Sequence, residues 1–195
     1  MFGEIALGSE FFERLVEIDA EITDRVAARG CRFCGGPLYR GDYDRKPRGG
    51  AVAAAAEAFS RRFSLCCGRE GCRRRATPPS VRFLGRRVYV GAAVVLASVV
   101  ALATMIAAAA QRATGVPAPT LRRWRRWWRG PFIKTAVFFD VASRIPGIEV
   151  RRMPVSILEA MTGGAGDRLR RLLVWLTPLT TTSTPDGSRF TRGLT

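Results

Sequence analysis

The sequence contains no histidine. Histidine is the usual general base of nucleophilic catalysis, so its absence excludes Ser-His and Cys-His catalytic pairs and histidine-dependent nucleases. No glycine-rich phosphate loop with lysine is present either, because GGAGDR at 163–168 lacks the Walker pattern. Together these absences remove the common catalytic arrangements that a chain of 195 residues would be expected to carry.

Lysine is nearly absent, and acidic residues are missing from one long span. Only Lys46 and Lys134 are lysines, a bias that GC-rich codons alone would produce. Residues 71–139 contain thirteen bases and no acid, which codon bias does not explain. The net charge is +16, and a surface without carboxylates suits a phosphate ligand. Composition therefore favours nucleic acid or an anionic membrane surface as the partner.

The N-terminus has no positively charged region ahead of an apolar run, so we expect no secretory signal. A cytoplasmic, nucleoid-associated location follows, in which the five cysteines stay reduced. An odd number of cysteines also argues against a disulfide framework.

Four of the cysteines form two pairs with the spacing of metal ligands. Cys31 and Cys34 are C-x2-C, and Cys67 and Cys72 are C-x4-C, with glycines beside each pair for tight turns. This pattern predicts a structural Zn²⁺ site with four thiolates, which contributes about 10 kcal/mol of folding free energy. Two alternatives stay open: Cys66 replaces Cys67 as a ligand, or the cysteines are reduced side chains packed as small apolar residues.

A run of 23 uncharged residues covers 88–110. Its length is that of a transmembrane helix, which would make the chain a single-pass membrane protein with a cytosolic zinc module. The run is rich in alanine, however, and bases flank both of its ends, so no charge asymmetry orients it. The interpretation that we favour divides it into two buried helices, at about 88–102 and 103–114.

The segment after this run has the pattern of a helix-turn-helix. Gly115 suits the end of one helix, and Pro119 suits the first turn of the next. Leu121, Trp124 and Trp128 form an apolar face, and arginines form another. The predicted DNA contacts on this helix are Pro119, Thr120, Arg122, Arg123, Arg126 and Arg129. The predicted DNA contacts in the segment before this helix are Arg73, Arg74, Arg75, Arg86 and Arg87. Arg82 is also predicted to contact phosphate. The alternative is an amphipathic helix on anionic lipid.

Cysteine pairs, a basic connector (73–91) and the TGVPAPTLRRW segment (114–124) resemble the zinc-ribbon and helix-turn-helix DNA-binding region of bacterial insertion-sequence transposases and their accessory proteins. The resemblance covers about residues 31–130 and implies sequence-specific binding of double-stranded DNA. It departs from that family at Gln111, where a small residue is usual, and no catalytic domain follows. We therefore predict that the chain is not an enzyme by itself and is associated with transposition or transcriptional regulation of a mobile element. A recombinase or transposase partner and a homodimer stay open.

The expected fold is mainly α, with a small zinc ribbon of short β-hairpins followed by a helix-turn-helix and further helices. Residues 1–24 contain seven acids, and the segment 8–29 shows helical periodicity. We favour a solvated amphipathic helix there, over one that folds back on the basic body or binds a partner. The predicted order is an acidic helix (1–29), a zinc ribbon (30–80), a helix-turn-helix (81–130), a helical segment (131–176) and a disordered tail (177–195).

Overall fold

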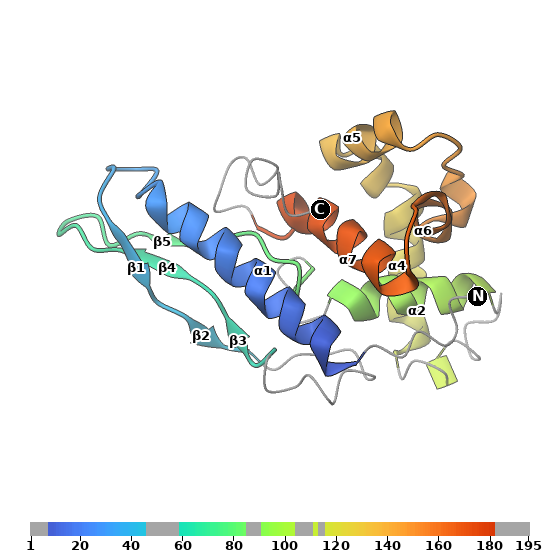
Figure 1. The fold of residues 1–195 in the computed structure, drawn as a ribbon, viewed down its shortest axis with the longest axis horizontal. Helices are drawn as coiled ribbons and strands as arrows, with labels where there is room; N and C mark the ends of the chain where they lie inside the picture. The colour runs from blue at the N-terminus through green and yellow to red at the C-terminus, as the bar shows by residue number, and fades with distance from the viewer. Residues whose placement is uncertain (1–7, 46–58, 85–90, 104–110, 113–115, 182–195) are drawn as a thin grey trace.

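The protein is mainly helical, with a small antiparallel β-ribbon at one end (Figure 1). A computed structural model describes residues 8–45, 59–84, 91–103, 111–112 and 116–181. In that part of the chain the α-helices are α1 (Ser9–Ala28), α2 (Gly91–Ala103), α4 (Ala118–Arg129), α5 (Ala136–Arg144), α6 (Val155–Ala160) and α7 (Ala165–Leu176). Short 3-10 helices are η2 (Phe132–Lys134), η3 (Val150–Arg152) and η4 (Thr177–Leu179). The strands are β1 (Leu38–Arg40), β2 (Tyr43–Asp44), β3 (Arg61–Arg62), β4 (Leu65–Cys67) and β5 (Arg75–Ala76). The prediction of a mainly helical fold with short antiparallel β-hairpins is confirmed.

The five short strands form a three-stranded sheet and a two-stranded sheet, which together make the ribbon. β1 pairs with β4 and β2 pairs with β3, both antiparallel, in one common register that places Leu38 opposite Cys67 and Tyr43 opposite Arg62. β5 pairs with the other edge of β4 and completes a three-stranded sheet. The ribbon is too small to form a core of its own, so its inner face has to be covered by another element.

Helix α1 covers the ribbon (Figure 1) and belongs to the main core. Its apolar stripe is at most 5% exposed and consists of Phe12, Leu15, Ile18, Ile22 and Val26. The same core contains Leu65 of the ribbon and Leu172 of α7. The interpretation of this segment as a solvated helix is therefore wrong, because its apolar stripe is wide enough to join the ribbon to the helical body.

Helix α2 is apolar on all sides, and other elements pack against two of these sides. Val95 and Val99 belong to the main core, whereas Val94 and Ala97 pack in a second cluster with residues of α4. A helix that is hydrophobic all round is expected at such a central position. The first buried helix predicted from the apolar run, at about 88–102, is thus present over the described residues Gly91–Ala103. Within the described ranges, no helix is both long enough and apolar enough to cross a membrane.

The remaining predicted elements are placed in part. The second helix predicted from the apolar run, 103–114, lies mostly outside the described residues. Within that segment the structure describes Gln111 and Arg112 as helical. The tail was expected to begin at Thr177, but Thr177 and Thr180 are buried. Thr180 Oγ1 accepts a hydrogen bond of 2.9 Å from the backbone N–H of Ser80. Side-chain hydroxyls thus fasten a segment whose composition resembles that of a disordered tail, and only residues 182–195 lie outside the description at this end.

Candidate metal centre and arginine surfaces

The first cysteine turn, residues 31–36, directly follows α1. The backbone N–H of Gly35 donates to the carbonyl of Cys31 at 2.7 Å, and the N–H of Cys31 donates to the carbonyl of Gly36 at 2.8 Å. Gly35 has a φ of +69°, a conformation that favours glycine. A Cβ on Gly36 would lie 3.3 Å from the sulfurs of both Cys34 and Cys67. The two glycines therefore allow the turn to close tightly around the sulfurs.

The second cysteine turn, residues 67–74, connects β4 to β5. Cys67 ends β4, and its N–H donates to the carbonyl of Arg74 at 2.9 Å. Cys72 lies in the turn, where its N–H donates to the carbonyl of Arg69 at 3.1 Å. Gly71 has a φ of +81°, which provides the reversal between the two cysteines. The hairpin thus presents both sulfurs on the side that faces the first turn.

The four Sγ atoms of Cys31, Cys34, Cys67 and Cys72 all lie within 4.8 Å of one another. The Sγ atoms of Cys34 and Cys67 are 3.5 Å apart, and those of Cys31 and Cys72 are 3.8 Å apart. A metal with metal–sulfur bonds of about 2.3 Å in a tetrahedron places its sulfurs about 3.8 Å from one another. The cluster therefore fits a tetrahedral metal ion. Within the described residues, no other group of cysteine and acidic side chains has this arrangement.

Cys66 is not part of this cluster. Successive side chains of a strand point to opposite faces, so Cys66 and Cys67 of β4 face away from each other. The Sγ of Cys66 donates instead to the carbonyl of Arg73 at 3.5 Å. The alternative in which Cys66 replaces Cys67 as a ligand is therefore excluded by the alternation of β4.

The thiols of the cluster differ in acidity. The N–H of Phe33 donates to the sulfur of Cys31 and lowers the pKa of Cys31 to about 7. For Cys67, the N–H of Arg69 favours the thiolate, but burial and the neighbouring sulfurs, Cys34 first among them, raise the pKa to about 12. Four negative charges at these separations repel one another strongly. The free cluster therefore retains protons that a bound cation would displace.

Helix α4 has the two faces that its sequence predicts. Leu121, Trp124 and Trp128 are buried against α2 and the main core. The indole Nε1 of Trp128 donates to Ser98 Oγ of α2 at 3.1 Å. Pro119 and the three arginines predicted to contact DNA, Arg122, Arg123 and Arg126, lie on the exposed side. Packing against α2 therefore fixes which face of α4 is available to a ligand.

Thr120 and Arg129, the other two residues of α4 predicted to contact DNA, are not fully exposed. Thr120 is only 9% exposed, which leaves it little surface for a base edge and argues against the predicted contact. Arg129 is half-buried, and its Nη2 donates to the backbone carbonyl of Arg151 in η3. Burial and the nearby positive charges of Arg125 and Arg151 lower the pKa of Arg129. Arg125 and Arg151 thus extend the cationic surface of α4, although the spacing argument from the sequence did not include them.

The arginines before the apolar run that were predicted to contact DNA differ in their exposure to solvent. Arg73, Arg74 and Arg75 are exposed on the second cysteine turn and β5. Arg86 and Arg87 lie outside the described residues. Arg82 is fully buried, so the prediction that it contacts phosphate is wrong.

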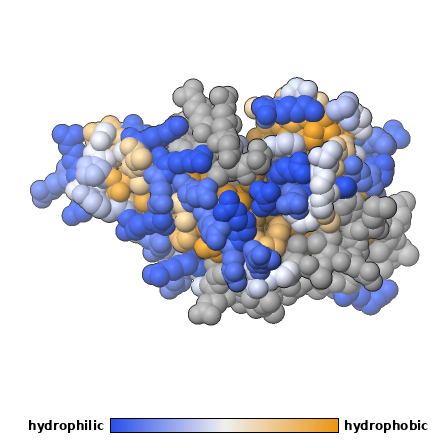
Figure 2. Space-filling view, viewed as in Figure 1, coloured by the Kyte–Doolittle hydropathy of each residue, from blue (hydrophilic) through white to orange (hydrophobic). Residues whose placement is uncertain are grey.

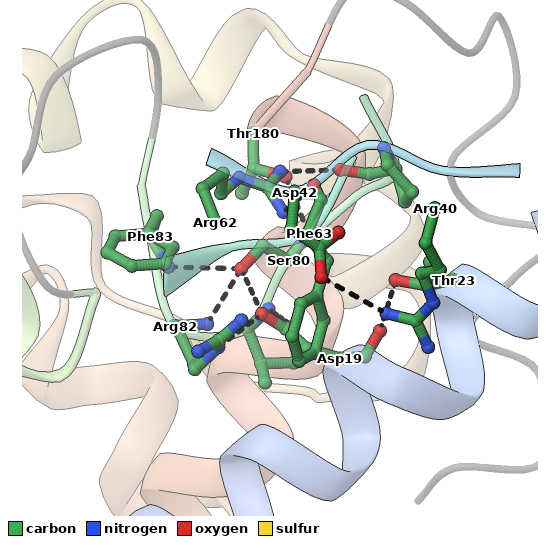
Figure 3. A network of polar contacts seen from close by, with 12 residues as sticks. Asp19, Thr23, Arg40, Asp42, Arg62, Phe63, Ser80, Arg82, Phe83 and Thr180 are labelled. Carbon is green, nitrogen blue, oxygen red and sulfur yellow. Dashed lines mark hydrogen bonds and ion pairs between the residues drawn. The ribbon is translucent and has the colours of Figure 1, made fainter. Parts of the chain in front are cut away.

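Arg82 belongs to a buried polar network around Asp19 of α1 (Figure 3). The Oδ2 of Asp19 accepts hydrogen bonds from Arg82 Nε at 2.7 Å and from Ser80 Oγ at 2.5 Å. Its Oδ1 accepts a hydrogen bond of 2.7 Å from the N–H of Val81. One carboxylate thus ties α1 to the segment that connects the ribbon to the helical body. The sequence holds a signal for this role, since Asp19 lies on the apolar face of α1, beside Ile18 and Ile22.

No family model, curated protein or solved structure matches the chain.

Proposed function

We propose that this chain is a zinc-stabilised DNA-binding protein that contacts duplex DNA through the exposed face of α4. In this proposal the four-cysteine cluster holds Zn²⁺ as a structural ion. Arg122, Arg123 and Arg126 bind phosphates and base edges in the major groove, and Arg73, Arg74 and Arg75 bind phosphates at a distance from it. The proposal includes no catalytic step.

The distribution of ion pairs carries this proposal. Among the described residues, several arginines on other helices pair with acids, as Arg14 does with Glu17 and Arg144 with Asp140. No arginine of α4 pairs with a carboxylate in this part of the chain. Exposed arginines without nearby carboxylates repel one another, and a polyanion relieves that repulsion.

The packing of α4 also supports its role as a recognition helix. Such a helix needs a rigid support and a defined N-terminus that points at the DNA. Leu121 and Trp128 anchor α4 on α2 and the core. Gln111 Oε1 accepts a hydrogen bond of 3.1 Å from the N–H of Ala118 and so caps the start of α4. The larger Gln111, which departs from the family pattern, thereby takes on a structural role in the turn.

The test is DNA binding measured by fluorescence anisotropy across a salt series, with zinc-replete protein. We expect Arg122→Ala/Arg126→Ala to weaken binding and to reduce the slope of log K against log salt by about 0.9 for each phosphate that the variant no longer neutralises. Comparison of duplex from the native locus with scrambled duplex tests sequence preference. A preference for the native duplex that disappears in the variant would assign base contacts to α4.

The matched control is Arg14→Ala/Arg144→Ala, which removes the same charge from exposed arginines that already pair with acids. This control should bind nearly as well as the unmodified protein. If both double variants lose affinity equally, binding depends on net charge alone, and the assignment to α4 fails.

The likeness to transposase accessory proteins extends the proposal to transposition or transcriptional regulation of a mobile element, with a recombinase as a protein partner. Co-purification of a co-expressed neighbouring recombinase with this chain tests that extension.

A further inference from the structure

Exposed aromatic side chains are concentrated at the ribbon. Among the described residues, the large hydrophobic side chains with substantial exposure are Phe33 at 48%, Tyr39 at 62% and Phe139 at 63%. Phe33 lies between the two cysteines of the first turn, and Tyr39 lies on β1. Figure 2 shows hydrophobic residues among hydrophilic ones at this end of the molecule. Core packing does not account for these two rings, because each keeps about half or more of its surface in water.

The turn backbone supports the ring of Tyr39. Its carbon atoms lie so close to Gly68 that a Cβ at that position would overlap with them. Gly68 N–H donates to the carbonyl of Pro37 at 2.9 Å, which holds the turn against the start of β1. Tyr39 is therefore seated on the second cysteine turn rather than free in solvent. A supported ring loses little conformational entropy when a ligand stacks on it.

Positive charge surrounds the other ring. The guanidinium carbon of Arg74 lies 4.2 Å from the ring centroid of Phe33, and that of Arg32 lies 4.5 Å from it. These distances are within the range of cation–π interactions, so both guanidiniums lie over the ring of Phe33. Neither arginine forms an ion pair with a carboxylate of the described residues. Arg73 and Arg75 add two exposed charges from the adjoining turn and strand. The second cysteine turn contains one exposed acid, Glu70. The arginines around it outnumber this acid, so this end of the molecule is strongly cationic.

We propose that the end of the ribbon formed by the two cysteine turns, with Phe33 and Tyr39, binds unpaired bases of single-stranded DNA. Bases stack on the exposed ring of Tyr39 and on the guanidinium planes that lie over Phe33, and Arg73 and Arg75 bind the phosphates between bases. Duplex DNA hides its base faces, so duplex binding alone would leave the two exposed rings without a ligand. The ribbon and α4 lie in different parts of the molecule (Figure 1), so this is a second site, which shares Arg73, Arg74 and Arg75 with the proposed duplex contacts but involves no residue of α4.

The experiment measures anisotropy of labelled oligothymidylate with the full-length, zinc-loaded protein. Phe33→Leu/Tyr39→Leu keeps apolar bulk at both positions but removes both aromatic faces. We expect this variant to bind oligothymidylate about tenfold or more weakly, since each stacked base contributes at least several-fold. Its affinity for duplex and for an abasic oligonucleotide of the same length should stay unchanged, because those ligands present no base face to stack.

Phe139→Leu is the matched control, because Phe139 is as exposed as Tyr39 but lies on α5. Metal content and the thermal melting curve of each variant show that the fold is kept. Unchanged affinity of Phe33→Leu/Tyr39→Leu for oligothymidylate would overturn the proposal, as would an equal loss in Phe139→Leu. Loss of binding to anionic lipid vesicles, with oligothymidylate binding retained, would assign the rings to a membrane surface and also overturn it. Loss of duplex binding in Arg122→Ala/Arg126→Ala, with oligothymidylate binding intact, would show that the two sites act independently.

Discussion

Arg82 donates a hydrogen bond of 2.7 Å from Nε to Oδ2 of Asp19, and neither side chain is exposed to solvent. The two residues are 63 positions apart in the chain. Ser80 and Val81 donate to the same carboxylate, so Asp19 accepts hydrogen bonds from three donors. A buried charge is tolerated when its partner and its hydrogen bonds are all present. Each partner of this pair therefore depends on the other.

Replacing Asp19 should destabilise the whole protein. In Asp19→Ala the guanidinium of Arg82 stays buried without its counter-ion, and removing one partner of a buried pair costs about 3–5 kcal/mol. We expect the free energy of unfolding, measured by urea titration, to fall by that amount. The urea midpoint of unfolding should be lower than in the unmodified protein. It should be the same whether unfolding is followed by far-UV circular dichroism or by tryptophan fluorescence.

Asp24→Ala is the matched control, because Asp24 is on the same helix and pairs with Arg40 at 3.0 Å on the exposed surface. Exposed ion pairs contribute about 0–1 kcal/mol, so this variant should unfold nearly as the unmodified protein does. A similar loss in both variants would mean that α1 is sensitive to the removal of any acid, and that the buried pair has no special role.

Removing one cysteine of the cluster should abolish tight metal binding. Cys31→Ser leaves three thiols, whereas Cys66→Ser leaves the four clustered sulfurs intact. We expect zinc content, measured by mass spectrometry of purified protein, to be lost in the first variant and kept in the second. Retention of zinc by Cys31→Ser would contradict the four-thiolate site.

Chelation of the metal should also destabilise the helical body. Leu38 and Leu65 of the ribbon lie in the same core as Leu172 of α7, so loss of the ribbon exposes part of that core. We expect a chelator to lower the melting temperature recorded from helical ellipticity in the unmodified protein. An unchanged melting temperature would show that the ribbon folds and unfolds separately.

Metal uptake should depend steeply on pH. A metal binds thiolates, so every proton that a thiol holds in the free site has to be displaced. The pKa of Cys67 is raised to about 12, so this thiol releases a proton on binding throughout the neutral range. The pKa of Cys31 is lowered to about 7, so below that pH a further proton has to leave. Apparent zinc affinity from competition with a chelator should therefore rise with pH, and most steeply below pH 7. An affinity that does not change with pH would contradict thiolate ligation.

Ser98 should be needed for the attachment of α4 to α2. Its Oγ accepts the indole N–H of Trp128, which is 0% exposed, and donates to the carbonyl of Val94 at 2.7 Å. Ser98→Ala leaves that N–H buried without an acceptor, which costs about 1–3 kcal/mol. Urea unfolding measures the loss. Ser143→Ala removes an exposed hydroxyl that bonds to a backbone carbonyl and should change stability by less than about 0.5 kcal/mol. Equal stability of the two variants would contradict the role of Ser98.

The sequence predicted features that depend on local spacing. The clustered cysteines could be chosen, with Cys66 left open as an alternative to Cys67, because tight turns require short intervals and glycine. The buried face of α4 could be assigned because Leu121, Trp124 and Trp128 follow the helical period. In both cases the information lies within a few residues of the chain.

Features that depend on distant contacts were missed. Arg82 stands in a basic stretch and resembles its neighbours, and only the fold brings it to an acid on α1. Thr177 and Thr180 have the composition of a flexible tail, yet hydrogen bonds to residues about a hundred positions earlier fasten this segment. Asp19 gave a signal in its position on an apolar face, but its partner could not be identified from periodicity.

The hydrogen bond between Ser80 and Thr180 closes a loop of 100 residues. Contacts so far apart in the chain form late and slowly, because the entropy of loop closure has to be offset before the contact stabilises anything. During synthesis α1 leaves the ribosome first, but the α7 residues that share its core follow more than a hundred residues later. The part of the core that α1 shares with α7 therefore stays incomplete until most of the chain has emerged, although the ribbon can pack against α1 earlier. We therefore expect the nascent chain to bind chaperones that recognise exposed apolar helices during translation.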